Sequence, residues 1–185
     1  MACEPGLLPA NRADDAVPNF RVQCYAVVLF PVRCERCGCS AQRSALWLPP
    51  MHEMRDDGDQ SAEDVWHVSN ECRLLHEVTW IQGAARSRLR EWQPNLRIAP
   101  RPSDGARLWI NHCEHCSAPV WGTTSLDGSP AALWMHGAGD ALVEVMPVPE
   151  PLVATALSWT VGDLPDKVLD AIAAEAAREA ASIAP

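Results

Sequence analysis

The sequence predicts an α+β fold, in which an antiparallel β core carries a helical insertion and is followed by a C-terminal helix. Two Cys-x-x-Cys pairs, at 34–37 and 113–116, each follow a run of strand-forming residues. Apolar residues recur at helical spacing between 70 and 92 and again between 164 and 182. The two pairs therefore define the β core, and the two periodic segments define the helices.

The 185 residues suit one domain with an insertion rather than two equal domains. Three prolines within residues 1–19 predict a disordered or loosely attached arm. Residues 20–146 form the predicted core domain, with the insertion at about 51–106. Residues 147–185 begin with three closely spaced prolines, so we expect a Pro-rich hinge and then the C-terminal helix.

The predicted strands flank the cysteine pairs. Val22 to Val32 is rich in β-branched and aromatic residues, and Ala45 to Leu48 returns after the first pair. Arg107 to Asn111 leads into the second pair, and Val120 to Thr124 is expected to pair with it on the far side. Leu142 to Val145 is a further candidate strand. Each cysteine pair is thus expected at the tip of a β-hairpin.

The helices are predicted from apolar spacing and from their end signals. In the insertion, Gly83 is expected to break one helix from the next, and Pro94 ends the second. The apolar positions that carry this prediction are Leu74, Leu75, Val78, Ile81, Leu89 and Trp92. Asp163 or Asp166 can cap a C-terminal helix from about Leu164 to Ser182. Its apolar stripe consists of Val168, Leu169, Ile172 and Ala176.

Four cysteines form the candidate metal site: Cys34, Cys37, Cys113 and Cys116. Four thiolates are the ligand set of a tetrahedral Zn²⁺ site. Gly38, directly after the first pair, supplies the positive φ that such a turn commonly needs, whereas Ser117 occupies the equivalent position in the second. A closed four-thiolate shell leaves no position for substrate, which favours a structural over a catalytic metal.

With their adjoining strands, these two motifs resemble the zinc-ribbon and rubredoxin-like group, whose members carry two Cys-x-x-Cys knuckles on facing hairpins. The resemblance implies structural Zn²⁺, with Fe as the less favoured metal. It departs from the group in one respect, because 75 residues separate Cys37 from Cys113.

Other cysteines and histidines offer competing ligands. Cys39 lies two residues after Cys37, His112 precedes the second pair and His115 lies within it. We do not include these three residues among the predicted ligands. A second group, His67, Cys72 and His76, would place its last two members on one helix face. Three mixed ligands could hold a zinc ion with an open position, so a small zinc enzyme is an alternative reading, although a non-enzymatic role is favoured.

The expected partner is another macromolecule, and a protein is favoured. The net charge of −9 opposes generic nucleic-acid binding. A local basic strip from Arg86 to Arg107 keeps a nucleic-acid-associated zinc ribbon open as an alternative. Most of the eight tryptophans are expected in the core, with Trp92 and Trp134 as candidate anchors for a partner. The oligomeric state does not follow from these patterns.

The sequence gives three expectations about location and source. No apolar run approaches the roughly 18 residues that a membrane span needs. The first 19 residues lack the pattern of a secretory signal, so a cytoplasmic protein is expected. Fourteen arginines against the single Lys167 are typical of a GC-rich bacterial gene.

Overall fold

A computed structural model describes residues 17–55, 65–121 and 144–161. Most of these residues lie in strands, and they include one α-helix. The elements in chain order are β1 (Phe20–Val22), β2 (Tyr25–Arg33), β3 (Ser40–Leu48), β4 (His52–Arg55), β5 (Trp66–Ser69), β6 (Arg73–Ile81), α1 (Gly83–Trp92), β7 (Leu96–Pro100), β8 (Arg107–Asn111), β9 (Glu144–Val148) and β10 (Leu152–Val161).

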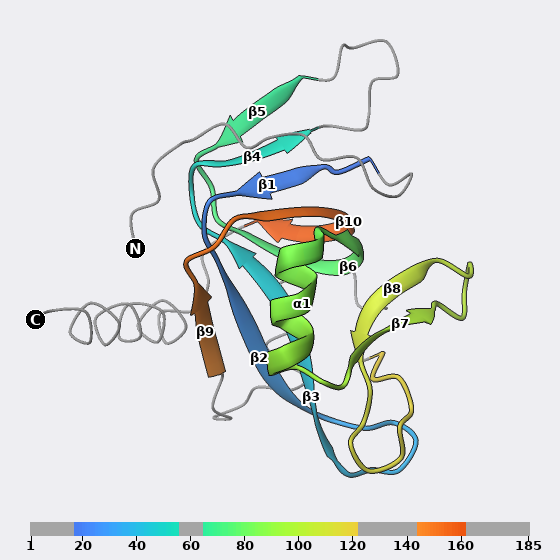
Figure 1. Ribbon diagram of the computed structural model, residues 1–185. Coiled ribbons are helices and arrows are strands. Elements are labelled where there is room, and N and C mark those ends of the chain that lie inside the picture. Colours follow the sequence, from blue (N-terminus) through green and yellow to red (C-terminus); the bar gives the residue numbers. More distant parts are fainter. Residues whose placement is uncertain (1–16, 56–64, 122–143, 162–185) are drawn as a thin grey trace, which may run out of the picture.

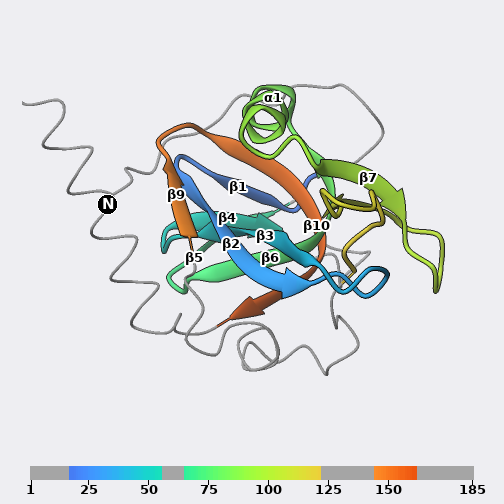
Figure 2. The ribbon, with the colours of Figure 1, turned by 90° about the horizontal axis from the view of Figure 1, so that it is seen from below.

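Eight of the strands form one open, curled antiparallel sheet in the order β5-β4-β1-β10-β6-β3-β2-β9 (Figures 1 and 2). The last strand of the described chain, β10, lies between β1 and β6 near the middle of this sheet. The two remaining strands, β7 and β8, pair with each other in a separate two-stranded ribbon. Residues that are far apart in the sequence therefore lie on neighbouring strands.

The predicted α+β class is wrong, because the described chain is mostly β. Strands occupy 57% of it and helix only 9%. The described residues of the expected helical insertion at 51–106 contain four strands, β4 to β7, and the single short helix α1. The predicted C-terminal helix, Leu164 to Ser182, falls outside the described residues.

The segment from Leu74 to Ile81 was predicted as helix but forms the strand β6. Its apolar residues are buried on both faces of the sheet: Leu74 belongs to one buried cluster and Leu75 to another. A bulge opposite Thr155 and Ala156 then shifts the alternation. A bulged strand that is buried on both faces can imitate helical spacing.

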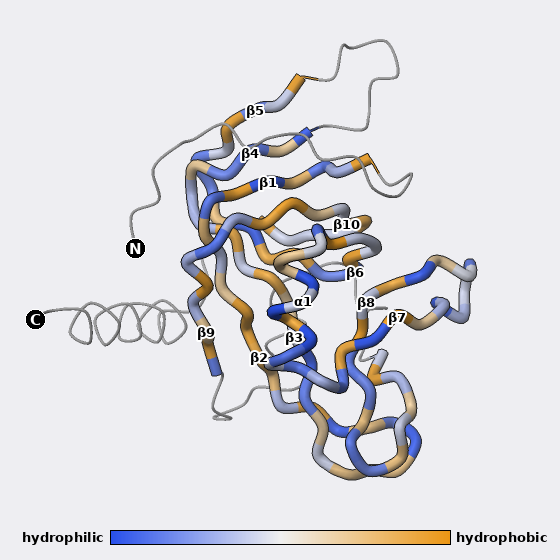
Figure 3. The backbone as a smooth tube through the Cα atoms, viewed as in Figure 1, coloured by the Kyte–Doolittle hydropathy of each residue, from blue (hydrophilic) through white to orange (hydrophobic). Residues whose placement is uncertain are grey.

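The core lies on both faces of the large sheet. Along β2, Val27 and Leu29 belong to the larger cluster, while Val28 and Phe30 belong to the smaller cluster on the opposite face. This double burial explains why β2 reads as a continuous apolar run, and Figure 3 shows the hydrophobic residues along it.

Helix α1 packs on the larger cluster through only two fully buried side chains, those of Ala85 and Leu89. Trp92 also packs against this cluster, and the remainder of the helix is rich in arginine, so that much of it has the hydrophilic colour in Figure 3. The predicted helical break at Gly83 is its first residue, and Pro94 follows its end. Of the one or two short helices predicted between 70 and 92, the one between Gly83 and Pro94 is therefore confirmed.

The chain enters the sheet through a buried asparagine. Asn19 is 2% exposed, and its side chain forms two hydrogen bonds with the backbone of Ala156, at 2.9 and 3.0 Å. The predicted loose arm therefore ends at a fixed residue, and residues 1–16 lie outside the described part. Within the described ranges, no helix has the length and apolar character needed to cross a membrane.

Candidate metal centre

The first cysteine pair lies in the turn that joins β2 to β3. The amide of Gly38 donates to the carbonyl of Cys34 at 2.8 Å, and the amide of Cys34 donates to the carbonyl of Cys39 at 2.9 Å. Gly38 has a φ of 72°, a conformation that glycine adopts without steric cost. This tight turn brings the sulfurs of Cys34 and Cys37 to the same side of the hairpin.

The second pair has the same backbone geometry. The amide of Ser117 donates to the carbonyl of Cys113, and that of Cys113 to the carbonyl of Ala118, both at 2.8 Å. Ser117 has a φ of 56° and so takes the place of Gly38, at the steric cost of its Cβ. The strand that follows is short: His112 bridges Pro119, and residues 122–124 of the predicted strand lie outside the described part.

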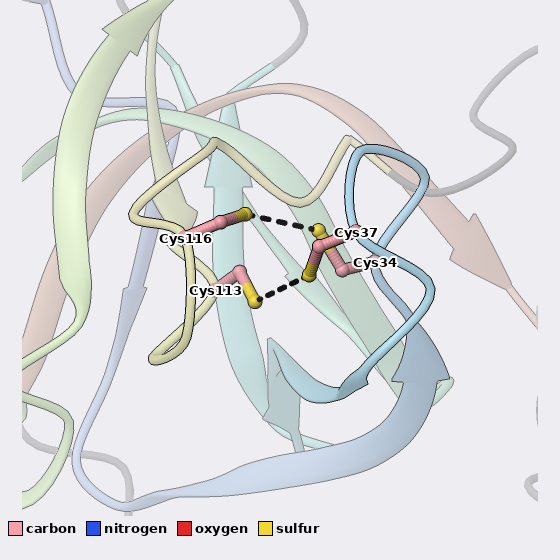
Figure 4. A group of neighbouring side chains, drawn as sticks. All are labelled: Cys34, Cys37, Cys113 and Cys116. Carbon is pink, nitrogen blue, oxygen red and sulfur yellow. Dashed lines mark hydrogen bonds between the residues drawn. The ribbon is translucent and has the colours of Figure 1, made fainter.

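The two turns face each other and bring the four cysteines together (Figure 4). The sulfurs of Cys34 and Cys116 are 3.6 Å apart, and those of Cys37 and Cys113 are 3.7 Å apart. All four lie within 4.8 Å of one another. Sulfurs about 2.3 Å from a central ion define a tetrahedron with edges of about 3.8 Å, so the cluster has the dimensions of a metal site.

The cluster has a small hydrophobic core of its own. Cys34 and Cys113 are buried with Ala41, Ala118 and Val120, and the other two cysteines pack against them. Low solvent access protects thiolates from competing water and so favours a stable site.

The pKa values of the two cysteines in the first pair are shifted in opposite directions. The amide of Cys37 donates towards the sulfur of Cys34 and is the main reason that its pKa is lowered to about 7. The amide of Cys39 acts in the same direction on Cys37, but burial and the three neighbouring sulfurs outweigh it and raise the pKa of Cys37 above its usual range. A bound metal ion would stabilise the thiolate form of all four cysteines, because its positive charge offsets the negative charges of the sulfurs.

The competing ligands next to the knuckles lie outside the cluster. The thiol of Cys39 donates to the carbonyl of Cys37 at 3.9 Å. His112 is 3.2 Å from the carbonyl of Ile110 through Nδ1, and His115 is exposed. The described part of the chain contains no further group of three or more potential metal ligands, so none of these residues joins the four cysteines.

The alternative group His67, Cys72 and His76 is not gathered into a site. His67 lies on the sheet-edge strand β5, Cys72 precedes β6, and His76 lies within β6. His76 lies 3.2 Å from the hydroxyl of Ser158. Burial, followed by the charge of Arg43, lowers the pKa of His76 to about 4.

The predicted basic strip is partly neutralised by acids from other elements. Arg88 of α1 forms an ion pair with Glu150, and Arg101 pairs with Glu77 at 2.7 Å and also with Asp104. The strip therefore presents fewer free cations than the sequence suggests.

The sequence did not single out the residue that holds the second knuckle in place. Asn111 is 2% exposed, and its Oδ1 accepts hydrogen bonds from the backbone amide and the hydroxyl of Ser44, at 2.8 and 2.7 Å. Its Nδ2 donates to Gln93 at 3.2 Å. The end of β8 is thereby fixed to β3 next to the cysteines. An amide side chain two residues before a knuckle was the only available signal.

Comparison with family models, curated proteins and solved structures finds no match to this chain. The four-cysteine cluster is compatible with a zinc-ribbon-like site, and it suggests a metal-stabilised module.

Proposed function

We propose that this chain is a zinc-stabilised binding or adaptor module that recognises another macromolecule, a protein. The observation that carries the proposal is the closed cluster of four cysteine sulfurs, all within 4.8 Å of one another. Four thiolates fill the tetrahedral coordination of zinc and leave none of it for a substrate, so the metal stabilises the fold and recognition falls to the protein surface. Zinc is preferred to iron because it is the usual ion of structural four-cysteine sites.

An apolar sheet edge supports a protein partner. Met51, Val65 and Val68 are 44%, 46% and 50% exposed, and all three lie beside or within the paired strands β4 and β5. β5 is the terminal strand on this side of the large sheet. An exposed edge strand with apolar side chains is a surface to which an extended segment of a partner can add by backbone hydrogen bonds.

The nucleic-acid alternative has weaker support. The net charge is −9, and Arg88 and Arg101 already pair with carboxylates. Phosphate binding by Arg88 or Arg101 would have to break these pairs, and the whole strip lies on a molecule of repulsive net charge. We therefore retain the protein partner as the proposal.

The metal is tested by elemental analysis of the protein purified without added metal. About one equivalent of zinc is expected, and Cys34→Ala or Cys116→Ala should lose it. The control is Cys39→Ala, which removes a cysteine outside the cluster and should retain the full equivalent. Less than half an equivalent of any metal in the unaltered protein would contradict the proposal.

The partner is tested by affinity capture from extracts of the native source, followed by binding of the purified candidate. Val68→Lys places a charge on the β5 edge and should weaken that binding at least about tenfold, because a desolvated charge opposes the contact. The control, Ile98→Lys, changes a 41% exposed side chain on the separate ribbon and should bind normally. Equal binding by all three proteins would exclude the β5 edge, and the absence of any protein partner would overturn the proposal.

A further inference from the structure

A pocket lies where β3 and β6 separate. These strands pair only from Leu46 and Leu75 to Leu48 and Arg73. Beyond that point β3 continues with β2, β6 continues with β10, and the ribbon strand β8 contacts both β3 and β6. Apolar side chains form most of the lining of the pocket, including Leu46, Leu75, Ile81, Leu89, Trp109 and Trp121.

One cation lines this apolar pocket without a partner. Arg43 of β3 is 9% exposed, and no hydrogen bond or ion pair joins its guanidinium to any of the described residues. Burial lowers the pKa of Arg43, which reflects the cost of holding its charge away from water, and the charge of Glu77 acts in the opposite direction. A buried and unpaired guanidinium offers a planar set of donors that suits a carboxylate.

The neighbouring charges leave this cation available. Glu77 also lines the pocket, but it already forms the 2.7 Å ion pair with Arg101. His76, with its pKa lowered to about 4, is neutral near pH 7 and adds no charge. Glu77 would repel a dianion more strongly than a monoanion, which favours a carboxylate over a phosphate.

The pocket wall contains a strained residue. Glu77 has a φ of 57°, which is unfavourable for a residue with a Cβ. The position lies close to the bulge between β6 and β10. Strain of this kind persists where surrounding structure holds a residue in place, and it is concentrated at ligand sites.

We propose that this pocket binds a small organic acid with an apolar, aromatic body, whose carboxylate is held by Arg43. The tryptophans and aliphatic side chains would contact part of the body, while the guanidinium would bind the carboxylate through two parallel hydrogen bonds. This ligand site goes beyond the protein-binding role proposed above and does not depend on it.

The pocket walls are also the strands that hold the metal cysteines. β3 begins three residues after Cys37, and β8 ends two residues before Cys113. Asn111 joins the two walls through its hydrogen bonds to Ser44. We therefore expect the metal to keep the walls at the correct separation, so that its removal weakens ligand binding.

The test measures binding of three probes, phenylacetate, 3-phenylpropionate and hexanoate, to the full, metal-replete chain by saturation-transfer NMR and titration calorimetry at pH 7. The matched amides, phenylacetamide, 3-phenylpropanamide and hexanamide, retain the body but lack the charge. At least one aromatic acid should bind, at least about tenfold more tightly than its amide, because a charge-assisted hydrogen bond is lost in the amide. Hexanoate should bind more weakly than the aromatic acids.

Arg43→Met keeps the length of the side chain and removes its charge, and it should abolish the preference for the acid over the amide. Arg43→Lys keeps the charge without the planar fork, and it should lose several-fold in affinity if the methionine variant does not fold. The matched control is Arg97→Met, which removes an exposed arginine of β7 that does not line the pocket. This control should bind the acid as the unaltered chain does.

Three results would each overturn the proposal: no binding of any of the acids, equal affinity for acid and amide, or unchanged acid binding in Arg43→Met and Arg43→Lys. Zinc content and partner capture are recorded for the same variants. If the Arg43 variants lose acid binding but keep their zinc and their protein partner, the ligand site is independent of the proposed adaptor function. Failure of the adaptor proposal would leave the comparison of acid and amide intact.

Discussion

Removing one knuckle cysteine should lower the free energy of unfolding by at least about 4.5 kcal/mol. The unfolded chain can bind a metal with all four cysteines only if it closes the loop from Cys37 to Cys113, which spans about 76 residues and costs about 4.5 kcal/mol at 25 °C. The folded chain has already brought the sulfurs within 4.8 Å of one another. The metal therefore favours the folded state by at least this difference.

The measurement is urea unfolding of metal-replete protein and of Cys113→Ala, followed by tryptophan fluorescence. With a slope of about 2.5 kcal/mol per molar urea, the midpoint should fall by about 2 M. Cys39→Ala is the matched control, because this cysteine lies beside the first knuckle but outside the cluster, and it should shift the midpoint by less than about 0.5 M.

In Cys113→Ala, the loss of stability should appear first in the strands next to the second knuckle. Hydrogen exchange should accelerate first in β7 and β8, because these strands form their own sheet and β8 leads directly into the second knuckle. Equal urea midpoints for metal-replete and metal-free protein, or exchange that accelerates evenly over both sheets, would refute the loop-closure reasoning.

Four further predictions concern other parts of the molecule. Ser117→Gly should stabilise the protein by about 0.5 to 1 kcal/mol, measured by thermal unfolding, because it relieves the cost of a φ of 56°. His76→Asn should reduce the loss of stability between pH 6.5 and pH 4: the folded pKa of His76 is depressed to about 4, so its contribution is complete above the unfolded pKa and is lost as the pH falls. This is read from urea midpoints at pH 7 and pH 5 with the metal content matched. Fluorescence anisotropy should give no submicromolar binding to DNA or RNA at about 0.15 M salt, since Arg88 and Arg101 are paired with acids; such binding would promote the nucleic-acid alternative. Deleting residues 152–185 should abolish folding, measured by circular dichroism, because β10 lies between β1 and β6; a folded truncation would instead support the predicted division at residue 147.

The cysteine cluster could be predicted from the sequence because each knuckle is encoded locally. Two cysteines, three residues apart and after a strand, are enough to form the turn, and Gly38 supplies its positive φ. That the two knuckles meet was an inference from the ligand count that zinc requires, and the distances agree with it.

The fold class could not be predicted in the same way, because strand pairing is non-local. Nothing near Phe20 in the sequence indicates that its partner is Ala154 on β10. Burial on both faces also removed the alternation that identifies β6 as a strand, and the bulge disturbed what remained. Local propensity was a better guide in α1, where Gly83 and Pro94 mark the ends.

The pocket could not be predicted from the sequence either. Arg43 reads as an ordinary polar residue of a hairpin, and its burial arises only because β3 and β6 separate under the ribbon. Asn111 likewise gains its role through contact with Ser44, a residue 67 positions away. Such roles are created by tertiary contacts, which a local pattern does not record.

The central position of β10 has a consequence for how the protein is made. A ribosome that adds about 5 to 20 residues per second completes β10 about 7 to 28 s after β1, and until then β1 and β6 both lack the neighbour that joins them. Both cysteine knuckles leave the ribosome earlier than β9 and β10. Metal capture can thus precede completion of the sheet and hold β3 near β8 in the nascent chain. The supply of a metal ion during translation, rather than afterwards, should then govern how much of the protein reaches its native fold.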